Sequence, residues 1–212
     1  MTASASEGLK SVPRYTSKAW RAFRPRSELG AITLVASQCR ILGLDPGSQC
    51  TGFGIIDSDE AGERHVISGH INVAGRAMVV RLQRIYAALS ALVGEHHPDV
   101  IAIERVFVHR NPDSALKLGQ ARGVALCAAA ALGASVHEYA PRAIKLAVTG
   151  YGAAAKPQVA HMVRTLLRLE PKLAADAADA LAAALCHAQS RRLAGLQSLG
   201  DERVAPARAT TR

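Results

Sequence analysis

The sequence contains no uncharged stretch long enough to cross a membrane. Its longest run without a charged residue is fifteen residues, 123–137, whereas a membrane-spanning helix needs about 20 apolar residues. The apolar segment of a secretory signal is also missing before Leu29. A chain of 212 residues, 49% of them hydrophobic, can bury a real core and has the size of one domain with appendages. We expect a cytoplasmic protein with no membrane attachment.

Cysteine residues are few and scattered. None of the four belongs to a C-x-x-C pair: Cys39, Cys50, Cys127 and Cys186. This spacing argues against a disulfide framework and against a thiolate metal cluster, and it fits a reducing compartment. We expect the cysteines to be packing residues.

Acidic residues are outnumbered, 17 Asp and Glu against 26 Lys and Arg, which gives a formal charge of +9 and suggests a polyanionic partner. Residues 105–172 carry ten basic and three acidic side chains, whereas residues 41–104 carry four basic and eight acidic ones. Residues 173–189 hold only two charges, Asp176 and Asp179. A basic middle between acidic flanks suits a protein that binds phosphates with one stretch and a hard cation with the others. Composition alone also allows an ordinary charge-mixed surface.

Periodicity divides the chain into three parts. Residues 1–39 form a basic flexible extension, residues 40–189 form the folded domain, and residues 190–212 form a basic flexible tail. Within the domain, apolar runs predict strands, and apolar residues spaced by three and four predict helices. The predicted strands are 41–44, 51–57, 64–73, 100–103 and 135–139, and the predicted helices are 76–97, 112–132, 141–148, 157–169 and 174–189. This order predicts an α/β domain with a mixed five-stranded sheet flanked by helices.

Two acidic residues end apolar strands, and two more lie near the start of a helix. Asp45 begins a D-P-G turn and, taken alone, is good turn chemistry. Glu104 ends a buried run and, taken alone, is a solvated acid at the surface. Asp176 and Asp179 lie where carboxylates favourably meet the helix dipole. Each residue therefore also has a purely structural explanation.

Considered together, the four acids predict a metal site. Asp176 and Asp179 are three residues apart, so they project from one helix face, and most of their neighbours are alanines. Such small side chains let a helix pack close to a sheet, which would carry both carboxylates toward the strand ends. Four converging carboxylates raise one another's pKa unless a cation is bound. Oxygen-only ligands favour Mg²⁺ or Mn²⁺ over zinc, and two such ions can promote phosphodiester hydrolysis.

Several segments, in order, carry a resemblance to a known family. They are ILGLDPGS (41–48), TGFG (51–54), IERVF (103–107), NPDSALKLGQARG (111–123) and ADAADAL (175–181). With them, residues 40–189 closely resemble the RuvC family of bacterial Holliday junction resolvases. The resemblance implies an RNase H-like fold of the integrase type and symmetrical Mg²⁺-dependent hydrolysis of two like-polarity strands of a four-way junction, in recombination and DNA repair. It also implies two Mg²⁺ ions per subunit, for which Mn²⁺ would substitute.

The resemblance further implies partners and residue roles. The expected partners are junction DNA, a second copy of the chain, and a branch-migration motor of the RuvA and RuvB type; the apolar stripe of helix 76–97 is available for the homodimer contact. The family's catalytic and metal-binding acids fall on Asp45, Glu104, Asp176 and Asp179.

Five further residues are expected to bind DNA: Phe107, Lys145, Lys156, Arg164 and Arg168. The lysines match family residues near the scissile phosphate, and the phenylalanine matches an aromatic residue that stacks at the junction centre. The two arginines are four residues apart, on one predicted helix face, and would add phosphate contacts. Taken alone, a lysine is as often a solvated residue, and an aromatic residue directly after a strand is ordinarily core.

The chain also departs from the family pattern. Gln49 and Cys50 follow the D-P-G-S turn where an arginine is common, and His109-Arg110 replaces a usual Ala-Lys pair. Most of the segment before Arg40 is additional, and we expect Val35 or a neighbouring position to be an alternative start. Two histidines, His161 and His187, have the ordinary interpretation of partly buried helix residues.

Two other functions are compatible with parts of the pattern. Asp45, Gly47 and Gly52 also resemble the phosphate loop of an actin-like ATPase, but such proteins need two domains of this kind around one nucleotide, and no second motif occurs. A non-catalytic junction-binding protein would have no need to retain four acids. Cleavage of a synthetic junction in Mg²⁺ but not in EDTA would separate these possibilities.

Overall fold

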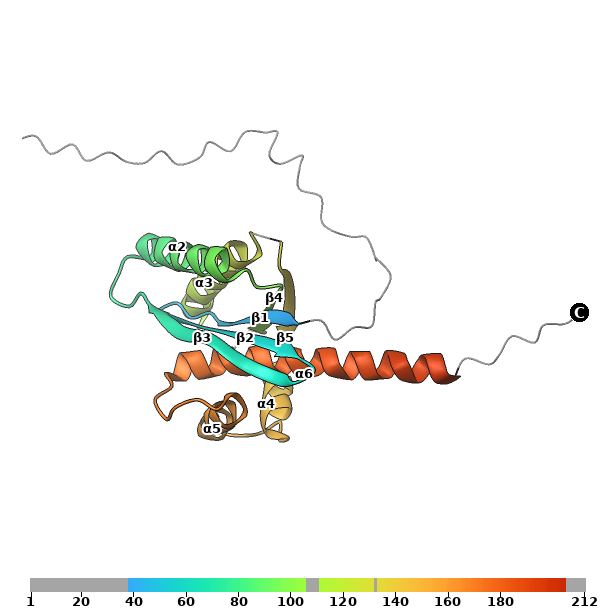
Figure 1. The fold of residues 1–212 in the computed structure, drawn as a ribbon. Helices are drawn as coiled ribbons and strands as arrows, with labels where there is room; N and C mark the ends of the chain where they lie inside the picture. Colours follow the sequence, from blue (N-terminus) through green and yellow to red (C-terminus); the bar gives the residue numbers. More distant parts are fainter. Residues whose placement is uncertain (1–37, 106–110, 132, 205–212) are drawn as a thin grey trace, which may run out of the picture. The chain divides into compact units, whose positions relative to one another are not determined.

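A computed structural model describes residues 38–105, 111–131 and 133–204, with side chains described up to residue 195. Its centre is a mixed five-stranded sheet, as the sequence predicts (Figure 1). The strands lie in the order β3-β2-β1-β4-β5. Their bounds are β1 Cys39–Asp45, β2 Cys50–Asp59, β3 Gly62–Asn72, β4 Val100–Glu104 and β5 Ser135–Tyr139.

The direction of the strands decides which residues meet at one edge of the sheet. β1, β2 and β3 form an antiparallel meander, whereas β4 runs parallel to β1 and β5 runs parallel to β4. Leu44 lies opposite Ile103 in the β1–β4 pair. Because parallel strands end at the same edge, the next residues along, Asp45 and Glu104, come together there.

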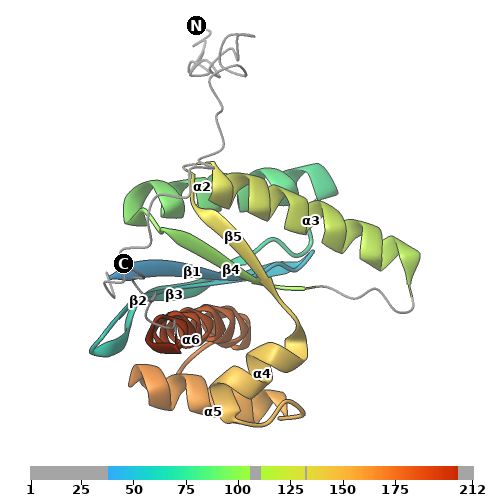
Figure 2. The ribbon, with the colours of Figure 1, turned by 90° about the vertical axis from the view of Figure 1, so that its right-hand side faces the viewer.

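Helices cover both faces of the sheet (Figure 2). On one face lie α2 (Met78–His96) and α3 (Pro112–Ala130), and on the other lie α4 (Pro141–Thr149), α5 (Lys156–Leu167) and α6 (Ala175–Val204). Alternate residues of β1 serve the two cores: Leu42 packs with α2 and α3, and Ile41 packs with α4, α5 and α6. None of the helices in the described ranges is long and apolar enough to cross a bilayer.

Local signals place most helix ends close to the predicted positions. Asn111 caps α3, where its side-chain oxygen accepts hydrogen bonds from the backbone N–H groups of Asp113 at 3.0 Å and Ser114 at 3.3 Å. Helices α3, α4 and α5 carry proline in their first turn, where its missing N–H is not needed. Gly150 ends α4 in the left-handed conformation, with φ of 74°.

The last helix is longer than expected. We expected it to end at Gln189, but α6 continues to Val204. Within residues 190–204, Leu193, Leu196 and Leu199 follow one another at intervals of three, and the segment is rich in residues of good helix propensity and contains no proline, so the helical signal continues past Gln189. Of the predicted extension at residues 1–39, only residues 38 and 39 are described, and Cys39 already belongs to β1. The end of the predicted tail, residues 205–212, also lies outside the described residues.

Helix α6 packs on the sheet at very short range. A Cβ atom at Gly43 of β1 would overlap the carbonyl oxygen of Ala180, and one at Gly52 of β2 would overlap that of Asp176. The backbone of α6 therefore rests directly on two strands. This close approach is what the alanine-rich sequence around the two helix acids suggests.

Candidate active site

A cavity of about 480 Å³ opens where β1 and β4 end. Three of the predicted acids line it, each from a different element: Asp45 from β1, Glu104 from β4 and Asp179 from α6. Two of the predicted DNA-binding lysines, Lys145 of α4 and Lys156 of α5, also line it. Residues that are distant in the sequence thus form one pocket with both charge signs.

The carboxylates are close enough to affect one another's protonation. Burial, followed by the negative charges of Asp179 and Glu104, raises the pKa of Asp45 from 3.8 to about 6, while Lys156 opposes the shift and Asp176 adds to it. Burial and Asp179 likewise raise the pKa of Glu104, against the two lysines. All four predicted acids therefore contribute to one negative electrostatic environment.

Lys156 partly neutralises this environment. Its Nζ atom lies 2.7 Å from Oδ2 of Asp179, and this hydrogen bond raises the pKa of the lysine. The side chain of Lys156 is 79% exposed, whereas that of Asp179 is 21% exposed. Because the ammonium group is exposed, it can leave Asp179 when another cation takes over the neutralisation of that partly buried carboxylate.

Asp176 occupies a different position from the other three acids. It is not among the described residues that line the cavity. Instead its Oδ2 atom accepts a hydrogen bond from the Cys50 thiol, with Sγ at 3.0 Å. Burial, together with this hydrogen bond and the nearby carboxylates, raises the pKa of Cys50 to about 12.

The donor set fits a hard divalent cation. Among the described residues, no three His, Cys, Asp or Glu side chains stand close enough, as arranged, to complete a metal centre. However, the candidate ligands are carboxylates, and after burial, the largest cause, the negative charges of Asp179 and Glu104 add to the raised pKa of Asp45. Carboxylate oxygens are the donors that Mg²⁺ and Mn²⁺ prefer, and a bound cation would relieve the repulsion.

Comparisons with known proteins agree with this geometry. A model of the family described as crossover junction endodeoxyribonuclease RuvC matches residues 41–187. The RuvC protein of Marinobacter nauticus is 56% identical over 148 residues, covering 70% of this chain and 85% of the relative. That of Alkalilimnicola ehrlichii is 53% identical over 148 residues, covering 70% of this chain and 90% of the relative. The chain belongs to the RuvC family.

Solved structures support the same assignment. Thermus thermophilus RuvC in complex with a Holliday junction substrate matches with a TM-score of 0.69 and 33% identity, over 74% of this chain and 97% of that one. The yeast mitochondrial Holliday junction resolvase matches with a TM-score of 0.54 but only 13% identity, over 77% of this chain and 82% of that one, and so shares the fold alone. The RNase H-like fold implied by the sequence resemblance to RuvC is confirmed.

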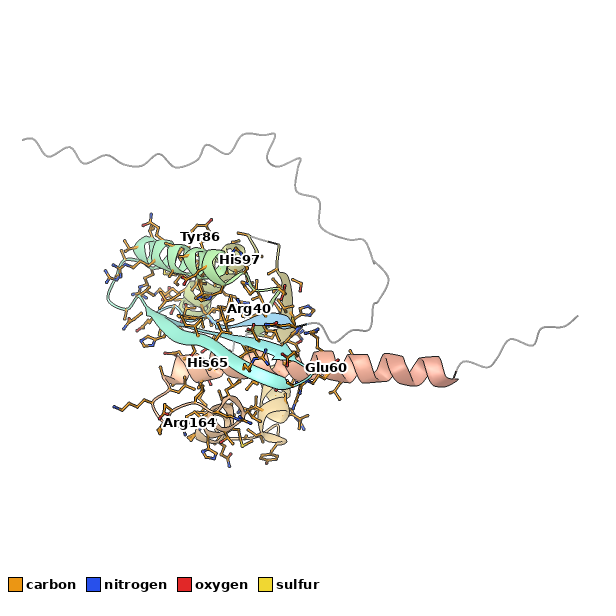
Figure 3. The ribbon with its side chains drawn as sticks, in the orientation of Figure 1. Arg40, Glu60, His65, Tyr86, His97 and Arg164 are labelled. Carbon is orange, nitrogen blue, oxygen red and sulfur yellow. The ribbon has the colours of Figure 1, made fainter. Side chains whose placement is uncertain are left out.

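The remaining predicted DNA-binding residues fall in different places. Arg164 and Arg168 line a separate hollow of about 420 Å³ beside α5, and Arg164, labelled in Figure 3, donates a hydrogen bond to the carbonyl oxygen of Pro171 at 3.0 Å. They do not line the cavity of the acids. Phe107 lies outside the described residues.

The structure reveals further basic and aromatic residues that sequence analysis missed. A hollow of about 660 Å³ is lined by Arg142, Lys145 and Tyr151, among others, and shares Lys145 with the cavity of the acids. Tyr151 is 64% exposed, and its position is set by hydrogen bonds between its backbone and the Thr149 hydroxyl. In the sequence, a tyrosine between two glycines, directly after a predicted helix, is a signal that could have identified this site.

A second missed residue supports the end of β4. Arg122, from the long RuvC-like motif of α3, donates a hydrogen bond to the carbonyl oxygen of Glu104 at 2.6 Å and another to Oε1 of Glu138 at 2.7 Å. Its side chain is only 14% exposed. One guanidinium group therefore ties α3 to β4 and β5 beside the candidate catalytic acid.

The two histidines differ from each other. His187 was expected to be partly buried and is almost completely buried. Its Nδ1 atom lies 2.7 Å from the Tyr139 hydroxyl, and burial lowers its pKa to about 4. His161 was expected to be partly buried but is exposed at the hollow of Arg164. Neither histidine lines the cavity of the acids.

Proposed function

We propose that this RuvC-family chain resolves four-way DNA junctions by hydrolysing phosphodiester bonds in two strands of like polarity. Membership of the family supports a nuclease of this type. The observation that carries the proposal within the structure is the cavity at the ends of β1 and β4, where three acids and two lysines meet. Mixed charge of this kind suits an anionic phosphodiester and the cations that would neutralise it.

In this proposal the catalytic acids hold two Mg²⁺ ions, for which Mn²⁺ substitutes. The ligands would be Asp45, Glu104, Asp176 and Asp179. When bound, the ions would supply Lewis-acid stabilisation of the negative charge that develops on phosphate oxygens. The carboxylates themselves contribute position, because each is held at the end of a strand or on a helix that rests directly on the sheet.

The basic residues would bind the DNA strand around this cavity. Lys145 and Lys156 lie in the cavity wall and would contact the phosphate at the cut. We infer that Lys156 exchanges its contact with Asp179 for the phosphate when DNA binds, because its ammonium group is exposed and the bound cations would neutralise Asp179 in its place. Phosphate contacts farther along the arms fall to Arg164 and Arg168, with Arg142 of the neighbouring hollow as an addition.

The assembly is also part of the proposal. Two copies related by a dyad would cut two strands symmetrically, with Phe107 stacking at the junction centre and a motor of the RuvA and RuvB type moving the branch point. The nuclease domain, expected to span residues 40–189, begins with Cys39 of β1, and its last helix continues past Gln189 to Val204. The reaction belongs in the cytoplasm of a bacterium, with the chromosome.

Cleavage of a synthetic four-way junction tests the proposal. We expect Mg²⁺-dependent nicks at symmetrical positions in two strands, none in EDTA, and far less cutting of a linear duplex of the same sequence. Asp45→Asn should abolish cleavage while junction binding survives, because the substitution removes one charge from the cavity and leaves the basic surface intact. Substantial cleavage by Asp45→Asn would refute the assignment. ATP turnover without DNA would instead favour the actin-like alternative.

A further inference from the structure

Cys50 contacts one of the four candidate metal-binding acids from outside their cavity. Cys50 is the first residue of β2, and in the sheet it lies opposite Asn72 of β3. Its side chain is partly buried, and its thiol donates a hydrogen bond to Oδ2 of Asp176 at 3.0 Å. These two residues are 126 positions apart in the sequence.

We propose that Cys50 is a positioning residue for Asp176. Its thiol holds one carboxylate oxygen and leaves the other available to a divalent cation. This inference rests on the proposed function, because the orientation of the Asp176 carboxylate affects cation binding only if Asp176 is a metal ligand. It adds to that function a determinant of cation affinity that belongs to this chain.

The backbone around the contact leaves little freedom to either partner. Asp176 lies where α6 rests directly on Gly52, so its Cα position is set by the contact between helix and sheet. On the other side, the hydroxyl of Thr51 donates to the carbonyl oxygen of Gly47 at 3.3 Å and closes the turn between Asp45 and Cys50. The thiol is therefore fixed to the same turn that carries Asp45.

The thiol restricts the side-chain rotation of Asp176. Asp176 is not among the described residues lining the cavity of the other acids, and without a partner its carboxylate would rotate between several orientations. A cation would then have to order it on binding. Partners of this kind commonly change metal affinity 10- to 100-fold, and a thiol is a weak donor, so an effect of roughly 3- to 10-fold is expected here.

The test compares three variants of the full chain by two measurements. Cys50→Ala removes the donor, Cys50→Ser restores a donor, and Cys127→Ala removes an exposed cysteine of α3 as a control. The first measurement is the Mg²⁺ concentration that half-maximally raises the Tm of the DNA-free protein. The second is the Mg²⁺ concentration that half-maximally supports junction cleavage.

We expect Cys50→Ala to need roughly 3- to 10-fold more Mg²⁺ in both measurements, with junction affinity in EDTA unchanged. Cys50→Ser should return to within about twofold of the wild type, because a hydroxyl also donates. Cys127→Ala should match the wild type. Should Cys50→Ala fail to fold, as judged by its Tm in EDTA, Cys50→Val keeps the apolar volume without the donor and takes its place.

An unchanged Mg²⁺ requirement in Cys50→Ala overturns the inference, and so does an equal shift in Cys50→Ala and Cys50→Ser, which would indicate packing rather than a hydrogen bond. Failure of the proposed function would give a different experimental result. In that case the wild type would not cut the junction, while the Tm measurement would still report whether the thiol governs cation binding.

Discussion

Asp45 links the electrostatics of the site to the stability of the protein. Its pKa is raised from 3.8 to about 6, first by burial and then by Asp179 and Glu104. Between pH 3.8 and about 6, the Asp45 carboxyl group is protonated in the folded protein and ionised in the unfolded chain. The resulting stability is fully present below pH 3.8 and is lost as the pH rises through about 6. At neutral pH the metal-free site therefore opposes folding.

Asp45→Asn should remove this cost. In EDTA at pH 7, we expect the variant to be more stable than the wild type by up to roughly 3 kcal/mol, about two pKa units at 1.4 kcal/mol each. The difference should shrink toward zero at pH 4. Urea unfolding of both proteins from pH 4 to pH 8 measures it. Parallel stability curves across this range would show that the raised pKa of Asp45 does not contribute to folding.

At the level of elements, the contact between α6 and the sheet sets the position of both helix acids. Gly43 has no room for a side chain, because a Cβ atom would overlap the carbonyl oxygen of Ala180. Gly43→Ala should therefore push α6 away, lower the free energy of unfolding by about 1–3 kcal/mol, and reduce cleavage by the molecules that remain folded. Urea unfolding and junction cleavage at saturating Mg²⁺ measure the two effects.

The matched control is Gly94→Ala on α2, where an added Cβ atom meets nothing within 4 Å. This substitution should stabilise the protein by about 0.5–1 kcal/mol, because alanine favours the helix, and should leave cleavage unchanged. If Gly43→Ala behaved like Gly94→Ala, the close packing of α6 would not be what holds Asp176 and Asp179 in place.

The same elements show what the sequence can and cannot predict. The apolar runs that end at Asp45 and Glu104 locate both strand ends, because a buried strand consists of consecutive apolar residues. The predicted end of α6 at Gln189 is too early, although the spacing of Leu193, Leu196 and Leu199 favours the longer helix that ends at Val204. The Cys50–Asp176 hydrogen bond depends on how closely α6 approaches β2. The alanine-rich segment favours close packing of the helix, but no local pattern shows which side chain of β2 meets Asp176.

At the level of the whole molecule, the apolar stripe of α2 that we expected to serve the dimer is buried in the core, at Ile85, Leu89 and Val93. The candidate dimer surface is instead the outer side of α2. Val79 and Tyr86 are 65% and 47% exposed, and because they are seven residues apart they share one helix face. Tyr86, labelled in Figure 3, lies on α2, in the helical layer on the opposite side of the sheet from α5 and Arg164. A second copy of α2 placed here would bury these side chains and leave the cavity of the acids open to DNA.

If the proposed dimer forms through this surface, a charge placed on it should separate the two copies. Val79→Glu and Tyr86→Glu should shift the protein from dimer to monomer in sedimentation equilibrium, because an unpaired carboxylate in an apolar interface is costly. Leu193→Glu, at a 60% exposed leucine on α6, should leave the dimer intact. On a junction, the monomeric variants should still bind but should nick the two strands independently, so that singly nicked junctions accumulate. Variants that stay dimeric would move the interface elsewhere, whereas monomers that still make paired cuts would show that symmetrical cleavage does not depend on this contact.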